Sequence, residues 1–415
     1  MFADSGGDSG SGPFLTRRGR GNVLTHVLTA VIGAGLALLL LLLFFSPASG
    51  GSLPGGDAVP SPAPSAAPLG QSQQDIVNKV RPGVVIINTT LQYDSAEAAG
   101  TGMVLNASGL VLTNNHVIRD STSITATVPA TRKTYTARVI GYDKTGDIAL
   151  IQLQGASGLA TVPVGNSTRV TTGQQVVALG NAEGQNSIST APGQVTGLNQ
   201  TVTASDDAGS TSSETLHGTI QTNADIVPGD SGGPLSASTG VIGMDTAGSD
   251  ANAQQAATGF AIPINTALSV ARQIAAGRAS TVVAIGYPAF LGIFIGSGSA
   301  SNPQDQAQQE QQQQGSGGGS SCSTSNADVS APSDIAPVSS GALVDGTICG
   351  SPADKAGLTG GSVITAVNGQ TTGSPDKLSA VLARFHPGDT ISVAWVSPSG
   401  QRTTSSIQLT AGPPQ

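Results

Sequence analysis

The chain has 415 residues, including 56 glycines, 24 prolines and two cysteines, and its formal net charge is −8. Charged residues make up 10% and aromatic residues 3% of the chain, which excludes a nucleic-acid-binding module because such a module needs a basic surface and stacking platforms. Two cysteines exclude a zinc ribbon, an iron–sulfur cluster and a small disulfide-rich scaffold. A chain of this length is expected to form two or three domains.

The uncharged apolar segment 23–45 predicts a transmembrane helix, since its 23 residues would span about 35 Å at about 1.5 Å per residue. Three arginines precede it, and no Lys or Arg follows until Lys79. This asymmetry predicts a single-pass protein of the cell membrane, with residues 1–22 in the cytoplasm and the remainder outside. A signal peptide cleaved near residues 46–48 is the alternative, and both interpretations export the rest of the chain.

The organisation beyond this segment changes with composition. Residues 46–74 are rich in Pro, Ala and Ser, which is typical of an extended tether. Short apolar runs separated by turn signals then favour antiparallel sandwiches or barrels over βαβ units. A helical pattern over 264–276, ended by Gly277, closes a predicted domain at 75–277.

A second domain is predicted at 278–415. It contains an insertion at 296–330 that is rich in Gln, Ser and Gly and is predicted to be disordered, because it cannot bury enough apolar surface to order itself. Regular structure is expected in four strands and one helix: strands 289–295, 341–344, 363–367 and 390–395, and helix 374–385.

The strongest chemical signal is the glycine-rich segment 228–234, Pro-Gly-Asp-Ser-Gly-Gly-Pro. Glycines beside a serine allow backbone N–H groups to turn toward a developing oxyanion, and the expected donors are those of Gly229 and Ser231. A serine hydroxyl also needs a base and an orienting carboxylate. His116 and Asp147 have suitable flanks, and the order His, Asp, Ser is that of the chymotrypsin-type proteases.

Each of these signals also has a structural explanation. Gly-Asp-Ser-Gly is a common turn, a lone histidine is more often structural than catalytic, and Asp147 could simply begin a strand. The three signals in this order favour catalysis, whereas His217 and His386 lack comparable flanks and His26 lies at the edge of the predicted span. The competing class is a protease scaffold without activity that binds peptide C-termini as a chaperone or adaptor.

With these motifs, residues 75–277 resemble the trypsin-like domain of the HtrA/Deg-type serine proteases. Within that family the chain looks most like the actinobacterial exported, PepA-like members. The resemblance is carried by segments 100–104, 112–117, 146–150, 228–234, 259–264 and 290–293. It implies an all-β protease domain of two six-stranded barrels, with His116 and Asp147 on the first and Ser231 on the second. It also implies a small α+β PDZ domain, a homotrimer and no metal, nucleotide or other cofactor. The implied substrates are exported polypeptides, above all misfolded ones.

Two aspartates depart from the family pattern. Asp230 stands where many members have Asn, and the sequence names no partner for it. Asp225 lies six residues before Ser231, a spacing that in trypsin-like relatives puts a carboxylate at the floor of the P1 pocket and favours Arg or Lys. The alternative is a different loop in which Asp225 is solvated or paired.

The resemblance to PDZ domains assigns Leu291, Gly292 and Ile293 to the loop that captures a peptide carboxylate, while the peptide adds a strand to a sheet edge. The alternative is a PDZ fold used only for packing. Cys322 and Cys349 lie outside the membrane in this interpretation, so a disulfide is expected, and closing a loop of about 28 residues would stabilise the fold by about 3 kcal/mol. The alternative is two free thiols.

Overall fold

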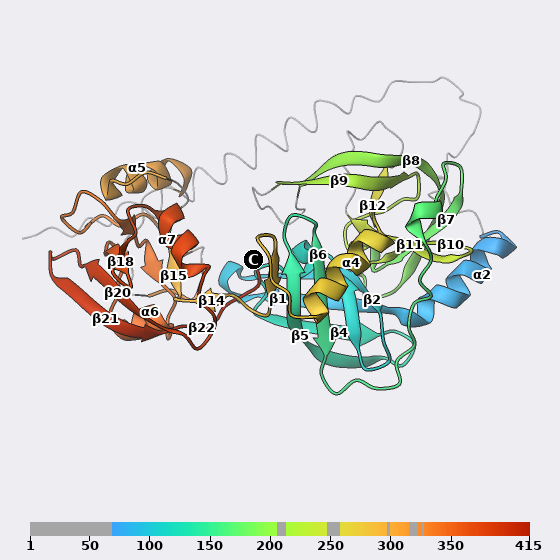
Figure 1. Cartoon of the computed structure of the whole chain (residues 1–415), viewed down its shortest axis with the longest axis horizontal. Helices are drawn as coiled ribbons and strands as arrows, with labels where there is room; N and C mark the ends of the chain where they lie inside the picture. Colours follow the sequence, from blue (N-terminus) through green and yellow to red (C-terminus); the bar gives the residue numbers. More distant parts are fainter. Residues whose placement is uncertain (1–68, 206–212, 247–257, 297–298, 315–321, 326–327) are drawn as a thin grey trace, which may run out of the picture. The chain divides into compact units, whose positions relative to one another are not determined.

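The computed structural model describes residues 69–205, 213–246, 258–296, 299–314, 322–325 and 328–415 (Figure 1). The predicted transmembrane span at 23–45, and the tether up to residue 68, lie outside the described residues. Among the residues that are described, no helix combines the length and the apolar character needed to cross a membrane.

The first sheet of the protease domain has seven strands in the order β13-β5-β4-β1-β2-β3-β6. They are β1 (Val84–Leu91), β2 (Ala96–Val104), β3 (Leu110–Thr113), β4 (Ser123–Val128), β5 (Lys133–Asp143), β6 (Ile148–Leu153) and β13 (Val283–Ile285). Buried and exposed residues alternate along β4 and in the first half of β5, as expected for strands with one face in a core. β5 also pairs with β6, so six of the strands form a ring. The additional strand β13 lies beyond residue 277, so this domain extends past its predicted end.

The second sheet is the closed six-stranded barrel that the sequence predicts, in the order β10-β11-β12-β9-β8-β7. Its strands are β7 (Gln175–Gly180), β8 (Ser189–Ser205), β9 (Ser213–Thr222), β10 (Pro234–Ala237), β11 (Gly240–Thr246) and β12 (Gly259–Pro263). Every residue of β10 and β11 is buried. β10 begins at Pro234, the last residue of the glycine-rich segment 228–234, and β11 pairs with β10, so these buried strands give the segment a rigid support.

Helices and short turns cover the two sheets. They are α2 (Gln71–Val80), α3 (Asn115–Ile118) and α4 (Ile264–Ala275), with 3₁₀ turns η1 (Arg81–Gly83), η2 (Gln92–Asp94), η3 (Ser167–Arg169) and η4 (Ala182–Gly184). α4 is the helix predicted from the pattern at 264–276. Its buried residues Ile264, Ala267, Ala271 and Ile274 recur every three or four positions and pack into the same core cluster as α2.

The described part of the C-terminal domain combines short strands and three helices around its own core. Its elements are β14 (Ala289–Phe290), β15 (Ile293–Phe294), α5 (Pro303–Gln314), β16 (Ala342–Leu343), β17 (Gly346–Thr347), α6 (Pro352–Ala356), β18 (Val363–Val367), β19 (Gln370–Thr371), α7 (Pro375–Leu382), β20 (Thr390–Val396), β21 (Arg402–Gln408) and β22 (Thr410–Ala411). Strands β16-β18-β20-β21 form the main sheet, with β19 on β18. Trp395, 3% exposed, lies in the core together with residues of α6 and α7.

The structure differs from the predicted disordered insertion at 296–330, because twelve of its residues form α5. Two buried residues, Gln306 and Ala307, attach this helix to the domain; Ala307 packs into a core cluster with Leu343 and Val363. Gln306 is 3% exposed, its Nε2 donates to the carbonyls of Ala300 and Gly341 at 2.9 and 2.8 Å, and its Oε1 accepts from the N–H of Leu343 at 2.8 Å. A prediction from composition counts glutamine only as a polar residue. Here the Gln306 side chain forms hydrogen bonds with backbone groups at the edge of β16.

A disulfide joins Cys322 to Cys349 across a sequence separation of 27 residues. The segment around Cys322 is also held by main-chain bonds, since the N–H of Ser323 donates to the carbonyl of Thr347 at 2.8 Å and the N–H of Cys349 donates to the carbonyl of Ser323 at 2.9 Å. The end of the insertion is therefore attached to the C-terminal domain beside β17.

Candidate active site

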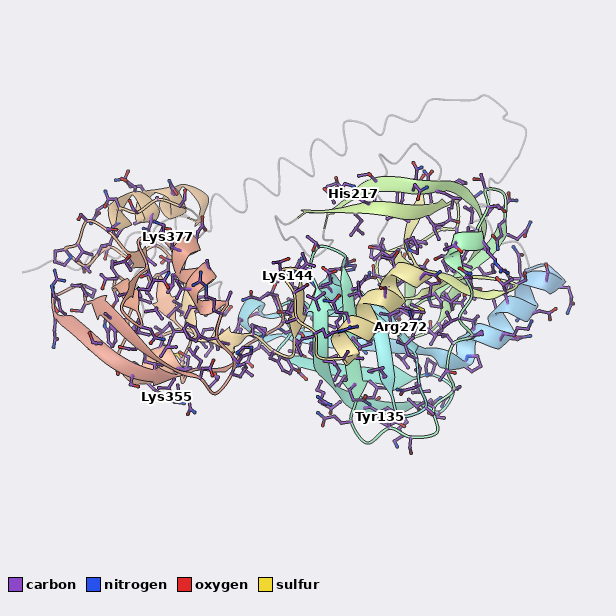
Figure 2. All side chains as sticks on the ribbon, in the orientation of Figure 1. Tyr135, Lys144, His217, Arg272, Lys355 and Lys377 are labelled. Atoms are coloured by element: carbon purple, nitrogen blue, oxygen red, sulfur yellow. A yellow bond between two sulfur atoms is a disulfide. The ribbon has the colours of Figure 1, made fainter. Side chains whose placement is uncertain are left out.

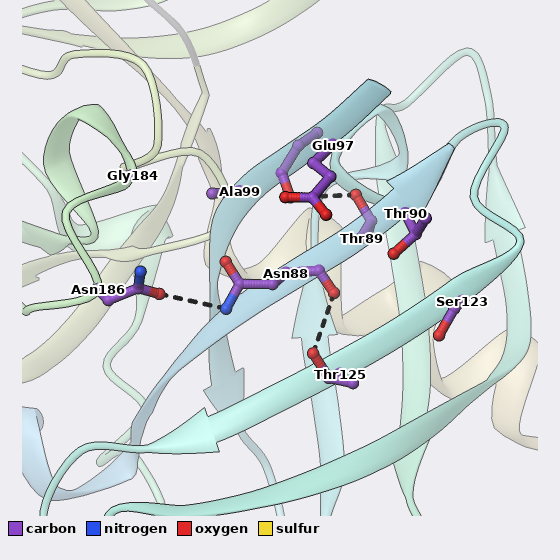
Figure 3. Close-up of a pocket in the computed structure, with 10 residues that line it drawn as sticks. Asn88, Thr89, Thr90, Glu97, Ala99, Ser123, Thr125, Gly184 and Asn186 are labelled. Atoms are coloured by element: carbon purple, nitrogen blue, oxygen red, sulfur yellow. Dashed lines mark hydrogen bonds between the residues drawn. The ribbon is translucent and has the colours of Figure 1, made fainter. Parts of the chain in front are cut away.

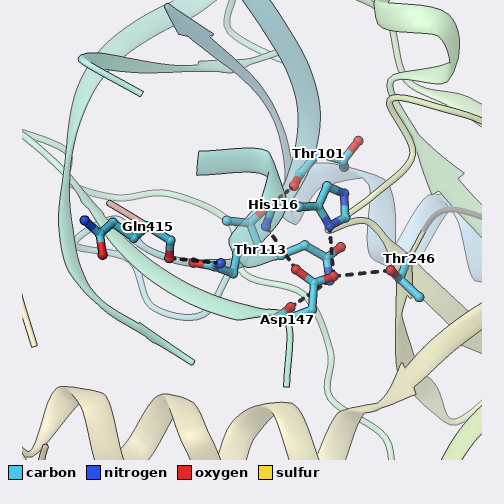
Figure 4. A network of polar contacts seen from close by, with 8 residues as sticks. Thr101, Thr113, His116, Asp147, Thr246 and Gln415 are labelled. Atoms are coloured by element: carbon cyan, nitrogen blue, oxygen red, sulfur yellow. Dashed lines mark hydrogen bonds and ion pairs between the residues drawn. The ribbon is translucent and has the colours of Figure 1, made fainter. Parts of the chain in front are cut away.

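The pairing of β3 with β6 brings His116 and Asp147 together. Thr113, the last residue of β3, lies opposite Ala149 near the start of the antiparallel strand β6. The chain that leaves β3 as α3 therefore passes the residue that precedes β6. The Nδ1 atom of His116 lies 2.9 Å from Oδ2 of Asp147, and the backbone N–H of His116 donates to Oδ1 at 3.0 Å (Figure 4).

The carboxylate of Asp147 is enclosed. Its side chain is 2% exposed, whereas the side chain of His116 is 21% exposed. Thr246 donates its hydroxyl to Oδ2 at 3.3 Å, and the amide of Asn114 donates to the backbone carbonyl of Asp147 at 2.9 Å. Because an ionised carboxylate only accepts hydrogen bonds, the neutral imidazole carries its proton on Nδ1 and keeps Nε2 as the basic nitrogen.

Sequence reasoning did not identify Thr246 and Asn114. Asn114 is adjacent to the recognised histidine segment, so its position was the one available signal. Thr246 comes from the end of β11 in the second barrel, about a hundred residues beyond Asp147, and no motif surrounds it. Its role appears only when the two barrels are assembled.

Ser231 reaches the same place from the second barrel. It is 4% exposed, and its carbonyl accepts the N–H of Thr101 at 2.9 Å. A side chain added at Gly100 would lie 3.3 Å from that carbonyl and would collide with Val117, the residue after His116. The nucleophile candidate and the histidine-bearing helix α3 therefore flank the same short stretch of β2.

Two backbone N–H groups at the turn around Ser231 have no hydrogen-bond partner among the described residues. Gly229 has φ of +93°, and a side chain there would collide with the carbonyl of Asn181, so the turn requires glycine. The turn is closed by the N–H of Gly233, which donates to the carbonyl of Asp230 at 2.8 Å. The N–H groups of Gly229 and Ser231 donate to no other described residue, which is the arrangement an oxyanion needs.

Behind this turn lie two buried carboxyl groups. Asp230 is 3% and Asp245 0% exposed; Oδ2 of Asp230 accepts the N–H of Val227 at 3.1 Å, whereas Oδ1 of Asp230 and both carboxyl oxygens of Asp245 accept no bond from a described residue. Burial, reinforced by the charge of Asp225, raises the pKa of Asp230 from 3.8 to about 6. Burial, reinforced by Asp230, raises the pKa of Asp245 well above its ordinary value.

Asp245 also holds the nucleophile turn through its main chain. The N–H of Gly232 donates to the carbonyl of Asp245 at 2.9 Å, and the N–H of Asp245 donates to the carbonyl of Gly233 at 2.7 Å. The surroundings of Asp230, unassigned from sequence, are thus the N–H of Val227 and a second carboxyl group.

Asp225 is exposed and lies between the buried residues Ala224 and Ile226. Its charge reaches Asp230 strongly enough to contribute to the raised pKa of that carboxyl group. Asp225 is therefore near the nucleophile turn, with its own side chain in contact with solvent.

In the C-terminal domain, Leu291 and Gly292 interrupt the predicted strand 289–295 between β14 and β15. Gly292 has φ of +79°, and a side chain there would collide with Ser351. Its carbonyl accepts from the N–H of Ile348 and the hydroxyl of Ser351, both at 3.0 Å, while Leu291 accepts the N–H of Ala353 at 2.9 Å. The loop predicted to capture a carboxylate, completed by Ile293 in β15, is thus held from the side of α6.

The remaining histidines have structural surroundings. His217 lies on β9, with Nδ1 3.1 Å from the hydroxyl of Thr201 (Figure 2). Nδ1 of the exposed His386 lies 3.7 Å from a carboxylate oxygen of Asp389. The described residues contain no group of three or more His, Cys, Asp or Glu side chains arranged to hold a metal ion.

Residues at the end of the chain contact the histidine-bearing helix. The N–H of Asp120 donates to the carbonyl of Pro414 at 2.7 Å, and the amide of Asn115 lies 3.4 Å from the carbonyl of Gln415 (Figure 4). These contacts surround α3 on the side of its buried residue Asn115.

The family model of the trypsin-like peptidase domain matches residues 100–244, and that of the PDZ domain matches residues 347–395. The chain is 31% identical to the serine protease PepD of Mycobacterium tuberculosis over 413 residues, which cover 94% of this chain and 77% of that protein. It is 30% identical to the periplasmic pH-dependent serine endoprotease DegQ of Escherichia coli, over 81% of this chain and 68% of that protein. The solved structure of the HtrA-type protease AlgW with a tripeptide is 25% identical over 82% of this chain and 97% of that one, with a TM-score of 0.42.

The match to PepD covers 94% of this chain and therefore runs through both the peptidase and the PDZ regions. The chain belongs to the HtrA-type serine endopeptidases.

Proposed function

We propose that this protein is a membrane-anchored, extracytoplasmic endopeptidase in which Ser231, His116 and Asp147 form the catalytic triad. The observation that carries the proposal is the 2.9 Å contact between His116 and the buried Asp147, beside a serine turn that has two N–H groups without partners among the described residues. The Ser231 hydroxyl attacks the peptide carbonyl while Nε2 of His116 takes its proton. Asp147 keeps the imidazole oriented and stabilises the imidazolium.

The N–H groups of Gly229 and Ser231 stabilise the oxyanion that develops on the carbonyl oxygen. His116 then returns the proton to the leaving amine, which breaks the peptide bond and leaves an acyl-enzyme on Ser231. A water molecule, activated by the same histidine, releases the second product. Every step uses side chains and backbone groups of this chain.

The decisive experiment compares the wild type with Ser231→Ala. Loss of a triad serine typically costs several powers of ten in rate, so casein cleavage and labelling by a serine-reactive phosphonate should both disappear in the variant. The thermal melting curve should stay unchanged, because the substitution removes one oxygen atom. A wild type that neither labels nor cleaves casein would favour the competing non-catalytic binder.

The location and assembly belong to the same proposal. The apolar segment 23–45 and the arginines before it support a single span with the protease outside, and the relative DegQ is named as periplasmic. Polypeptides exported in a misfolded state are the proposed substrates, and the proposed assembly is a homotrimer. Alkaline extraction of membranes tests the span, and light scattering of the detergent-solubilised protein tests the trimer.

The PDZ domain is proposed to bind peptide C-termini at Leu291, Gly292 and Ile293, and thereby to tune proteolysis. The carbonyls of Leu291 and Gly292 accept hydrogen bonds from Ala353, Ile348 and Ser351, which supports a role for the N–H groups of this loop in binding a carboxylate, as in other PDZ domains. A peptide with a free C-terminus should bind in a fluorescence titration and its C-terminally amidated form should not. Equal binding of the two peptides would contradict the proposal.

A further inference from the structure

A polar pocket of about 450 Å³ lies on the outer face of the first barrel, next to the proposed active site (Figure 3). Its floor is built by two rows of side chains that cross three neighbouring strands. Glu97 of β2, Thr90 of β1 and Ser123 of β4 form one row, and Ala99, Asn88 and Thr125 form the other. Residues two apart in a strand share a face, so both rows face the same way.

A loop of the second barrel turns this face into a pocket. Gly184 and Asn186 form the facing wall, and Asn88 donates its amide hydrogen to Oδ1 of Asn186 at 3.3 Å. A polar outer face is ordinary for an antiparallel sheet. What distinguishes this one is the wall contributed by the other barrel.

Both walls of the pocket lead to the nucleophile turn. Ala99 precedes the stretch of β2 where the N–H of Thr101 donates to the carbonyl of Ser231 at 2.9 Å. On the other side, the N atom of Gly184 lies 3.0 Å from the position of a side chain at Gly229. A polypeptide that leaves the proposed oxyanion site in this direction enters the pocket directly.

The pocket has the chemistry of a cation site. Its lining side chains are hydroxyls, amides and small apolar groups, and Glu97 is the one charged member. Glu97 is exposed and forms no ion pair with another described residue. Oxygen atoms of hydroxyls and amides around one carboxylate suit an ammonium or guanidinium group, whose hydrogen atoms are all donors.

We propose that this pocket is a substrate subsite in which Glu97 selects a lysine or arginine side chain of the polypeptide being cleaved. The inference rests on the proposed protease activity. Glu97 lies four residues before Thr101, and a strand rises about 3.3 Å per residue, so the charge is about 13 Å from the nucleophile turn. The selected side chain is therefore displaced from the scissile bond by up to about four residues and is separate from the P1 side chain.

The test measures kcat/KM for a series of quenched fluorescent peptides in which arginine or its neutral isostere citrulline occupies one position within four residues of the scissile bond. An exposed ion pair is worth a few-fold in rate, so at one position the wild type should prefer arginine about two- to fivefold. Glu97→Gln should bring that ratio to about one, and Glu97→Lys should bring it below one. Higher ionic strength should lower the ratio in the wild type, because the pair is exposed to screening.

Asp75→Asn is the matched control, since it removes the same charge from the exposed face of α2, away from the pocket. It should keep the wild-type arginine-to-citrulline ratio at every position. A wild-type ratio of about one throughout, or the same ratio in Glu97→Gln as in the wild type, would overturn the inference while leaving the protease activity intact. Absence of any cleavage by the wild type would instead overturn the proposed function and the inference with it.

Discussion

At the nucleophile turn, the ionisation of Asp230 is opposed by its own burial and by the neighbouring Asp225. The folded protein holds the proton of Asp230 up to a pKa of about 6, whereas the unfolded chain releases it near pH 4. Folding therefore takes up a proton between these values, and the free energy of unfolding falls as the pH rises from about 4 to 6. Two pKa units correspond to about 3 kcal/mol.

Asp230→Asn removes this pH dependence, since an amide does not titrate and its oxygen can still accept the N–H of Val227. Urea denaturation should show that the variant loses about 3 kcal/mol less than the parent between pH 4 and 6. Both proteins carry Ser231→Ala so that self-digestion does not interfere. Parallel pH profiles would show that the Asp230 carboxyl group is not the one that titrates.

In the proposed mechanism Thr246 is a positioning residue, because its hydroxyl contacts Asp147 and would act on the substrate only through that carboxylate. Removing a hydrogen bond to a charged group costs about 1.5 kcal/mol or more, so Thr246→Val should lower kcat about tenfold. Thr246→Ser keeps the hydroxyl and should restore most of the rate. If both variants lose activity equally, the methyl group and its packing, rather than the hydrogen bond, explain the effect.

The sequence predicted candidate site residues that stand in recognisable motifs. It did not predict residues that depend on their three-dimensional position and have no motif around them. Ser231 was recognisable because reactive serines need glycines beside them, and His116 because its flanks are distinctive. Thr246 and Glu97 carry no such local sign, since each acquires its surroundings from strands far away along the chain.

At the scale of elements, periodicity predicted α4 and most strands, while composition failed for α5. A glutamine-rich stretch has no continuous apolar face, so its hydrophobic pattern does not predict a helix. Gln306 provides what the pattern lacks, because it satisfies the main chain of β16 and of the segment before α5, and the neighbouring Ala307 packs into a core cluster. Such a contact depends on the fold of residues that follow some 35 positions later.

Gln306→Leu should release α5 from the sheet, since the N–H of Leu343 and the carbonyl of Gly341 would lose their partner. A buried unsatisfied group costs about 1–3 kcal/mol, so the amide of Leu343 should exchange hydrogen about thirtyfold faster, as read by mass spectrometry. The matched control is Gln308→Leu, at an exposed position of the same helix. Equal exchange in the two variants would mean that the helix does not depend on Gln306.

At the scale of the whole molecule, the Cys322–Cys349 disulfide closes a long loop of the C-terminal domain. Cross-linking residues 27 apart reduces the entropy of the unfolded chain and should stabilise this domain by about 3–4 kcal/mol. The single tryptophan, Trp395, is buried in the same domain, so its fluorescence reports on this domain alone.

Replacing both cysteines by serine in the Ser231→Ala protein should therefore shift the tryptophan-detected urea transition to lower concentration. The same shift is expected when the unchanged disulfide is reduced with dithiothreitol. Superimposable transitions before and after reduction would show that the bond does not contribute to the stability of the domain.

The pairing of β13 with β5 limits the distance between the first barrel and β14, the first strand of the PDZ domain. Gly286, just after β13, still donates its N–H to Ile140 of β5 at 2.8 Å, and β14 of the PDZ domain begins at Ala289. Only Tyr287 and Pro288 lie between, and a fully extended chain covers about 3.5 Å per residue. The start of β14 therefore lies within about 10 Å of the end of that pairing. Under the proposed function, a polypeptide bound by the PDZ domain is kept close to the protease domain of the same chain, which raises its local concentration there and limits its access to the protease domain of a distant molecule.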